Sequence, residues 1–349
     1  MRPGRWLRAW LWFLGVLHGV VLFAGFFAPY APLEQDRSHP YLPPMRLHVF
    51  DGQGRLHARP FVYLLQPRSA SFGEYDQDIA HPVPLEFFVT GAGYRLLGVV
   101  PCTAHLFGAE NARIYLLGSD GFGRDLLSRL LYGGQISLLA GLLATGVALF
   151  VGLAVGSFAG YSAGWRDELL MRLAELFLAL PWLYLLIGLR AFLPLSVGPT
   201  EAFLLVVLVI GAVGWARPAR LVRGVVLGAK ERDYVRAARG FGAGHGYILC
   251  RHVLPETYSV MLTQAAVLIP QYVLAEVTLS FLGLGVPEPA PSWGNLLAAL
   301  QQYNVLASYW WMYLPALAMV PFFAGYLGVA NALRERSNPL KIESFGNRR

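Results

Sequence analysis

The side chains most often used in catalysis are concentrated in one polar stretch of the chain. Five histidines and two aspartates lie there: His39, His48, His57, His81, His105, Asp76 and Asp78. Imidazole and carboxylate groups could hold a metal ion or act as general acid and base. Their spacing fits no metal-site signature, and the stretch contains neither His-Glu-x-x-His nor a nucleophile elbow. A membrane-anchored enzyme with its site in this stretch is therefore a remote alternative.

A second group of residues resembles part of an ATPase. Residues 131–135, Leu-Tyr-Gly-Gly-Gln, are close to the Leu-Ser-Gly-Gly-Gln signature of ATPase subunits. That signature acts only beside a phosphate-binding loop, in which Lys is followed by Ser or Thr. Here Lys230 is followed by Glu231, and Lys341 by Ile342. We therefore expect no ATP hydrolysis and no other enzyme activity, and no bound cofactor or metal.

A third candidate is the basic segment 233–255. Ala237 and Ala238 are strong helix formers, Gly242 is expected to end that helix, and Pro255 to limit a second one. Two adjacent alanines would give the helix a smooth face that could lie in a groove of a partner protein. The alternative is an ordinary basic loop.

The elements that position these residues are membrane helices. Hydrophobic residues make up 56% of the chain and charged residues 14%, whereas soluble domains carry roughly a quarter charged residues. No charged side chain occurs in 131–165 or 289–333, and about 20 apolar residues suffice to cross the hydrocarbon core as a helix. The apolar runs predict an all-α integral membrane protein with six spans, at 7–27, 136–159, 169–194, 202–215, 260–284 and 307–332.

The distribution of positive charge orients these spans. The net charge is +7, and Arg and Lys cluster before the first span, in 217–251, and after the sixth span up to Lys341. Six spans place all three clusters on one side, which the positive-inside rule identifies as the cytoplasm, together with both termini. Basic loops explain the charge, so we expect no nucleic-acid partner. Cys102 and Cys250 would lie on opposite sides of the membrane and cannot pair.

This topology leaves a large segment outside the cytoplasm. The turn around Asp51 and Gly54 predicts a β-hairpin, and 83–100 a second strand-like stretch. The expected organisation is an N-terminal helix (1–28), a small β-containing extracytoplasmic insertion (29–130), a core of five helices (131–340) with a cytoplasmic loop (217–256), and a cytoplasmic tail (341–349).

The basic segment also carries a family resemblance. It is similar to the Glu-Ala-Ala loop of the permease subunits of binding-protein-dependent ATP-binding-cassette importers, although Arg236 stands where Glu is usual and His252 where Ile is usual. The resemblance implies a short coupling helix that docks on an ATPase subunit. It assigns this role to Asp233, Ala237, Ala238, Gly242, Leu254 and Pro255.

Other segments resemble the dipeptide, oligopeptide and nickel group of these permeases. They are 117–129, 161–168, 274–285 and the run Pro291-Ser292-Trp293-Gly294. The resemblance implies a type I importer permease in a bacterial cytoplasmic membrane, with membrane lipid around it. Its partners would be a second homologous permease, two ATPases and an extracytoplasmic solute-binding protein. Peptides are the expected solute; nickel, oligosaccharides or another small solute are alternatives.

Glu276 is the one charged residue deep in the fifth span. An ionisable side chain in a membrane helix normally faces the bundle interior or a water-filled cavity. Glu276 could lie on the translocation path and meet a peptide amine, or it could be a structural carboxylate. A stand-alone secondary transporter is a further alternative, but such proteins usually need more spans or inverted repeats.

Overall fold

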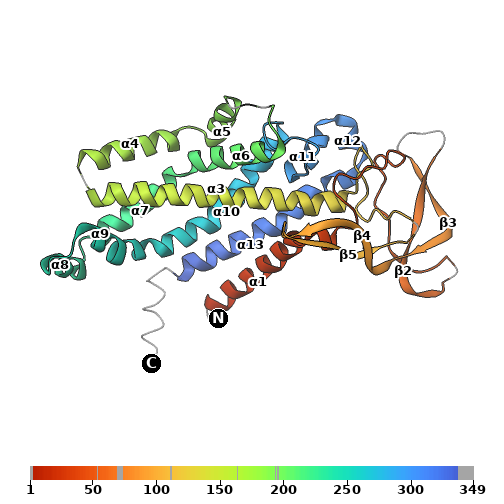
Figure 1. Ribbon diagram of the computed structural model, residues 1–349, viewed down its shortest axis with the longest axis horizontal. Coiled ribbons are helices and arrows are strands. Elements are labelled where there is room, and N and C mark those ends of the chain that lie inside the picture. Colours follow the sequence, from red (N-terminus) through yellow and green to blue (C-terminus); the bar gives the residue numbers. More distant parts are fainter. Residues whose placement is uncertain are drawn as a thin grey trace. The chain divides into compact units, whose positions relative to one another are not determined.

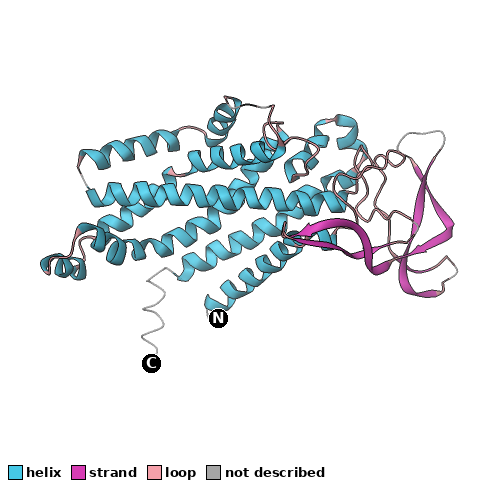
Figure 2. Cartoon of the chain, viewed as in Figure 1, coloured by secondary structure: helices cyan, strands magenta, loops and turns pink. Residues whose placement is uncertain are grey.

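The computed structural model describes residues 3–52, 54–68, 74–110, 112–162, 164–192, 194 and 196–336. Helices make up most of this chain, and the described strands all fall within 48–108 (Figure 2). Gln53 of the expected hairpin turn, Lys341 and the rest of the tail 341–349 lie outside the described residues.

The elements follow one another as labelled in Figure 1. They are α1 (Pro3–Leu22), α2 (Ala24–Phe27), β1 (His48–Phe50), β2 (Leu56–Pro67), β3 (Tyr75–Pro84), β4 (Glu86–Leu96), β5 (Val100–Gly108), α3 (Leu126–Ser162), α4 (Trp165–Ala179), α5 (Trp182–Ala191), α6 (Pro199–Gly214), α7 (Ala216–Ala229), α8 (Asp233–Gly240), α9 (His245–Ile248), α10 (Tyr258–Phe281), α11 (Trp293–Ala298), α12 (Tyr303–Ser308) and α13 (Leu314–Arg336).

Several of these helices can cross a membrane. Among the described residues, α3 and the helical runs His245–Phe281 and Trp310–Arg336 are long and apolar enough, and two bent helix pairs raise the number to five if each pair forms one span. The helix α1 is not counted with them, because Arg5, Arg8 and His18 dilute its apolar residues. The first predicted span, 7–27, and with it the total of six spans, therefore stays a prediction.

The third and fourth predicted spans are not straight single helices. The third is broken into α4 and α5, which meet at 93°. Pro181 stands at the break as the residue before α5, and a proline lacks the N–H that would continue the helical ladder. The fourth does not end at residue 215, because α6 continues at a 43° bend into α7. The arginines of α7 end the apolar run without ending the helical conformation.

The chain forms two compact units. The helical unit comprises 1–14, 138–279 and 321–349, and the β-bearing unit comprises 15–137 and 280–320. Each of the long helices α1, α3, α10 and α13 contributes to both units, and the predicted organisation with divisions at 28 and 130 stays a prediction.

In the helical unit, α3 packs closely against α7 through a stripe of glycines. A Cβ atom added at Gly156 would lie 2.4 Å from the carbonyl oxygen of Ala219, and one at Gly152 would lie 2.6 Å from Pro218. The small residues therefore allow a close backbone approach. Nearby, Arg223 of α7 donates to both carboxylate oxygens of Asp167 of α4, at 2.5 and 2.6 Å.

The β-bearing unit contains an antiparallel sheet of order β1-β2-β3 and a separate β4-β5 hairpin. The turn predicted around Asp51 is present, with Phe50 opposite Leu56. Most of the strand-like stretch predicted at 83–100 is β4 (Glu86–Leu96), although the stretch also includes the end of β3 and the first residue of β5. A buried apolar cluster lies beneath the strands, formed by Leu42, Met45, Val62, Leu65, Leu85, Phe107, Ile114 and Tyr115.

Candidate functional site

The helix α8 is a short, well-terminated helix within the segment that the sequence singles out. Gly242 follows it with a φ of 83°. The N–H of Gly242 donates to the carbonyl of Arg239, and the N–H of Ala243 donates to the carbonyl of Ala238, each at 3.0 Å. These two bonds form a Schellman motif, in which a left-handed glycine satisfies the last carbonyls of a helix. The glycine pattern predicts this geometry.

One side of α8 is anchored and the other is open. Val235 is fully buried among residues of α7 and α9. Asp233, Arg236, Ala237 and Gly240 are exposed and follow the helical spacing of one face. Ala238 lies half-buried on the side of Val235. The two alanines therefore differ: Ala237 belongs to the open face, and Ala238 to its border.

The polar contacts of this loop involve the two positions that depart from the family pattern. Arg236 pairs with Glu231 at 3.3 Å, and the ring of His252 contacts the rings of Tyr234 and Tyr247. The Tyr234 hydroxyl donates to Glu256 at 3.0 Å, which ties the start of α8 to the turn before α10. Partial burial and this hydrogen bond raise the pKa of Tyr234.

Pro255 does not end the second helix, contrary to the prediction. The chain passes from α9 through a π-helical turn (Leu249–Val253) and a 3₁₀ turn (Leu254–Thr257) into α10. Pro255 cannot donate to the carbonyl four residues before it. The change of helical register accommodates that missing bond, so the helical run continues to Phe281.

Glu276 lies within α10 and is 0% exposed. A cavity of about 390 Å³ in the same unit is lined on α10 by Leu268, Gln271 and Tyr272, and Glu276 follows Tyr272 by one helical turn. The placement of Glu276 on a translocation path stays a prediction.

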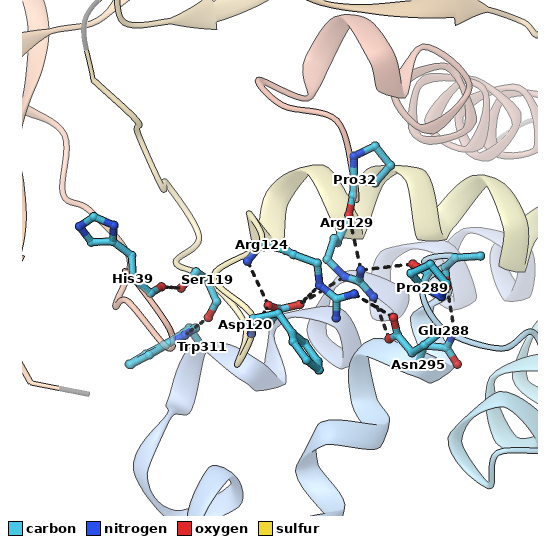
Figure 3. A network of polar contacts seen from close by, with 12 residues as sticks. Pro32, His39, Ser119, Asp120, Arg124, Arg129, Glu288, Pro289, Asn295 and Trp311 are labelled. Atoms are coloured by element: carbon cyan, nitrogen blue, oxygen red, sulfur yellow. Dashed lines mark hydrogen bonds and ion pairs between the residues drawn. The ribbon is translucent and has the colours of Figure 1, made fainter. Parts of the chain in front are cut away.

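A closed ring of ion pairs lies in the β-bearing unit and was not predicted as a site (Figure 3). Arg124 contacts Asp120 at 2.7 Å and Glu288 at 2.9 Å. Arg129 contacts Glu288 at 2.9 Å and Asp120 at 3.5 Å. Positive and negative groups alternate, so each charge has two opposite neighbours. The ring joins the segment before α3 to the loop after α10.

Three of the four residues in the ring are buried. Arg129 is 0% exposed, and Asp120 and Arg124 are buried, whereas 46% of the Glu288 side chain is accessible. A cavity of about 550 Å³ beside the ring is lined by all four residues. Asp125, which caps α3 through hydrogen bonds from Ser128, is also buried, and this burial raises its pKa to about 6.

The histidines of the polar stretch do not converge. His39, His57 and His81 each contact an aspartate close in sequence, and His105 is bonded to the carbonyl of Ala28. Among the described residues there is no group of three or more side chains placed to hold a metal ion.

Residues 152–338 match a family described as binding-protein-dependent transport system inner membrane component. The chain belongs to this family. The match includes α8, Gly242, the turns through Pro255, and Glu276, so the candidate coupling loop lies inside the matched region. Asp120, Arg124 and Arg129 of the ring precede the match, although Glu288 lies within it.

Relatives of this inner membrane component include named permeases. A protein of Brucella ovis that bears the name of a peptide permease is 32% identical over 289 residues, which cover 81% of this chain and 90% of the relative. The oligopeptide transport system permease protein OppC of Bacillus subtilis is 32% identical over 243 residues, with coverages of 68% and 76%. A solved amino acid ABC transporter aligns with 60% of this chain and 94% of its own, with 17% identity and a TM-score of 0.44.

Proposed function

We propose that this chain is a transmembrane permease subunit of an ATP-binding-cassette importer that carries peptides. With a second, homologous permease it would form the translocation path. Two cytoplasmic ATPases would drive the cycle, and an extracytoplasmic solute-binding protein would deliver the solute. The chain itself would bind no cofactor.

The observation that carries this proposal is the geometry of α8. The helix is fixed to its own unit by Val235 and ended by the Gly242 motif, while Asp233, Arg236 and Ala237 face outward. A rigidly held helix with a small, open face suits a contact that must transmit movement between subunits. In the same unit, the ion pair between Arg223 and Asp167 holds α7 against α4.

The proposed topology has six spans in a bacterial cytoplasmic membrane, with α1 as the first and both termini cytoplasmic. The coupling loop 217–256 then faces the ATPases. The strands β1 to β5 form an extracytoplasmic insertion between α1 and α3. The clustering of arginines in α7 and α8 supports this orientation.

Peptides are the proposed solute because both relatives bear the names of peptide or oligopeptide permeases. Nickel, an oligosaccharide or another small solute would use the same machinery, and selectivity in such a system rests largely on the separate binding protein. We expect peptides to compete with a labelled peptide for uptake, and nickel and oligosaccharides to leave it unchanged.

Reconstitution tests the proposal. The complete complex in proteoliposomes, with binding protein and external labelled peptide, should accumulate peptide only when ATP is supplied to the ATPases. A matched preparation that lacks this chain should accumulate none. Equal uptake in both preparations, or ATP-independent uptake by this chain alone, would refute the proposal; the second result would favour a secondary transporter.

A further inference from the structure

The turn of the β4–β5 hairpin is unusually apolar for an exposed turn. We call residues 96–100, Leu-Leu-Gly-Val-Val, the hairpin tip. Leu97 is 56% exposed, Val99 77% and Val100 54%. Three large apolar side chains therefore project from one turn, and no charged residue lies among them.

The backbone conformation of the hairpin tip is one in which a leucine is uncommon. Leu97 has a φ of 53° and Gly98 a φ of 75°, and the N–H of Val99 donates to the carbonyl of Leu96 at 3.1 Å. Positive φ at both central residues is typical of a type I′ turn, which favours Asn, Asp or Gly. A leucine in this conformation is uncommon. An apolar side chain thus occupies a position where a small polar residue would fit with less strain.

Contacts with α2 show which way the tip points. Tyr94, near the tip, lies against Gly25, whereas His105, nearer the base of the hairpin, is bonded to the carbonyl of Ala28 at 2.6 Å. The chain from Gly25 to Ala28 leads away from α1. The tip therefore points back toward the end of α1, while β4 and β5 themselves contact α2.

The depth of the tip follows from backbone geometry. The three residues from Tyr94 to Leu97 extend about 10 Å, at roughly 3.3 Å per residue. An α-helix rises about 1.5 Å per residue, so this reach corresponds to about two turns of helix. The tip then lies level with the last turns of α1, where Val16 and Leu22 are themselves 60% and 51% exposed.

We propose that the hairpin tip inserts into the outer leaflet of the membrane, among lipid acyl chains. This inference rests on the proposed function, because it takes α1 as a membrane span. Lipid is the proposed occupant because the exposed apolar residues of the tip continue the exposed apolar surface of α1 within the same unit. Arg95 is exposed directly behind the tip, where its guanidinium would reach the level of the phosphate headgroups.

Spin labelling of the complete complex in phosphatidylethanolamine and phosphatidylglycerol vesicles tests this proposal. Cys102→Ser and Cys250→Ser remove the native thiols, and Val99→Cys receives the label. Leu56→Cys, 69% exposed at the start of β2, is the matched control. We expect oxygen to relax the label at Val99 several-fold more effectively than a water-soluble nickel chelate, and the reverse at Leu56. Leu97→Cys should repeat the result for Val99.

Two results would overturn the insertion. Access of the nickel chelate to both Val99 and Leu56 would place the tip in water. A label at Val99 that is immobile and shielded from both reagents would place it against another protein. A label at Phe150→Cys, where the native side chain is 74% exposed on α3, tests the membrane assignment separately from the insertion of the tip. A lipid-exposed Phe150 with a water-exposed Val99 refutes only the insertion, whereas a water-exposed Phe150 refutes the membrane assignment as well.

Discussion

Arg129 and Glu288 are 159 residues apart in the sequence, and their side chains are joined by a hydrogen bond of 2.9 Å. Arg124 contacts the other carboxylate oxygen of Glu288, also at 2.9 Å. One carboxylate thus neutralises two buried arginines that precede α3 and open it. The loop after α10 is held to the start of α3 by charge as well as by packing.

Glu288→Gln should weaken the β-bearing unit. The amide keeps a similar shape but leaves Arg124 and Arg129 with only Asp120 as a carboxylate partner. We expect a loss of about 1.5–3 kcal/mol, the usual range for a hydrogen bond to a charged group, measured as a lower unfolding midpoint of the purified protein. Glu86→Gln is the control, because its pair with Arg59 is exposed and 3.9 Å long. Equal effects of the two variants would contradict a structural role for the ring.

Asp125 should make stability depend on pH. Burial raises its pKa from 3.8 to about 6, against the lowering effect of hydrogen bonds from Ser128. The folded protein then holds a proton that the unfolded chain releases, so the contribution of Asp125 is greatest below about pH 4 and is lost as pH rises to about 6. In Asp125→Asn this decline should vanish, so the gain in stability over wild type should grow from near zero at about pH 4 to roughly 1–3 kcal/mol above about pH 6.

Unfolding curves of wild type and Asp125→Asn at several pH values between 4 and 7 would measure the difference. Asp36→Asn should behave oppositely. Burial raises the pKa of Asp36, but hydrogen bonds from Ser38 and His39 outweigh it and lower the pKa to about 2, so removing that charge should cost stability at neutral pH. If the stability of wild type and of Asp125→Asn changed equally between pH 4 and 7, Asp125 would be ionised in the folded protein, and the predicted shift of its pKa would be refuted.

Local signals in the sequence predict local structure here. The left-handed geometry of Gly242 follows from its place after a helix-forming run, and the break at Pro181 follows from the missing N–H. The helical continuation past Pro255 was missed because π and 3₁₀ turns have no clear sequence signature. The extension of α6 into α7 was missed because the end of an apolar run marks the expected end of a membrane segment. It does not mark the end of the helix, which can continue through polar residues.

The ion-pair ring could not be predicted from single segments. Asp120, Arg124 and Arg129 lie in the stretch 117–129, which resembles the importer permeases. Glu288, which completes the ring, is remote from this stretch in the sequence. A pattern of charges shows that partners are needed without showing which they are. Glu276 is buried within α10, as expected for an ionisable side chain in a membrane helix, and its place on a translocation path stays a prediction.

The two cysteines provide a test of topology. Cys250 is exposed on the π-helical turn after α9, and Cys102 is partly exposed on β5. A hydrogen bond with Tyr94 lowers the pKa of the Cys102 thiol and favours its labelling. A membrane-impermeant maleimide added to intact cells should label Cys102 only, and inside-out vesicles should expose Cys250 only. Labelling of both thiols from one side would refute the proposed orientation.

Glu276→Gln separates the two roles considered for this acid. If the carboxylate lies on the path, the neutral variant should assemble normally and transport amine-bearing peptides several-fold more slowly. Uptake of an N-acetylated peptide, which has no amine charge, is the internal control and should change little. Failure of the variant to assemble with its partners would instead assign Glu276 a structural role.

The coupling role of α8 is tested most directly by placing a bulky side chain on its open face. Ala237→Trp should lift a close-fitting partner away, since overpacking a contact typically costs roughly 1–3 kcal/mol, while Val235 and the Gly242 motif still hold the helix. Ala80→Trp makes the same change at an exposed site on β3. In the reconstituted complex, we predict that Ala237→Trp reduces peptide uptake and peptide-stimulated ATP hydrolysis together, and that Ala80→Trp reduces neither. Normal uptake by Ala237→Trp with the ATPases still bound would contradict the account.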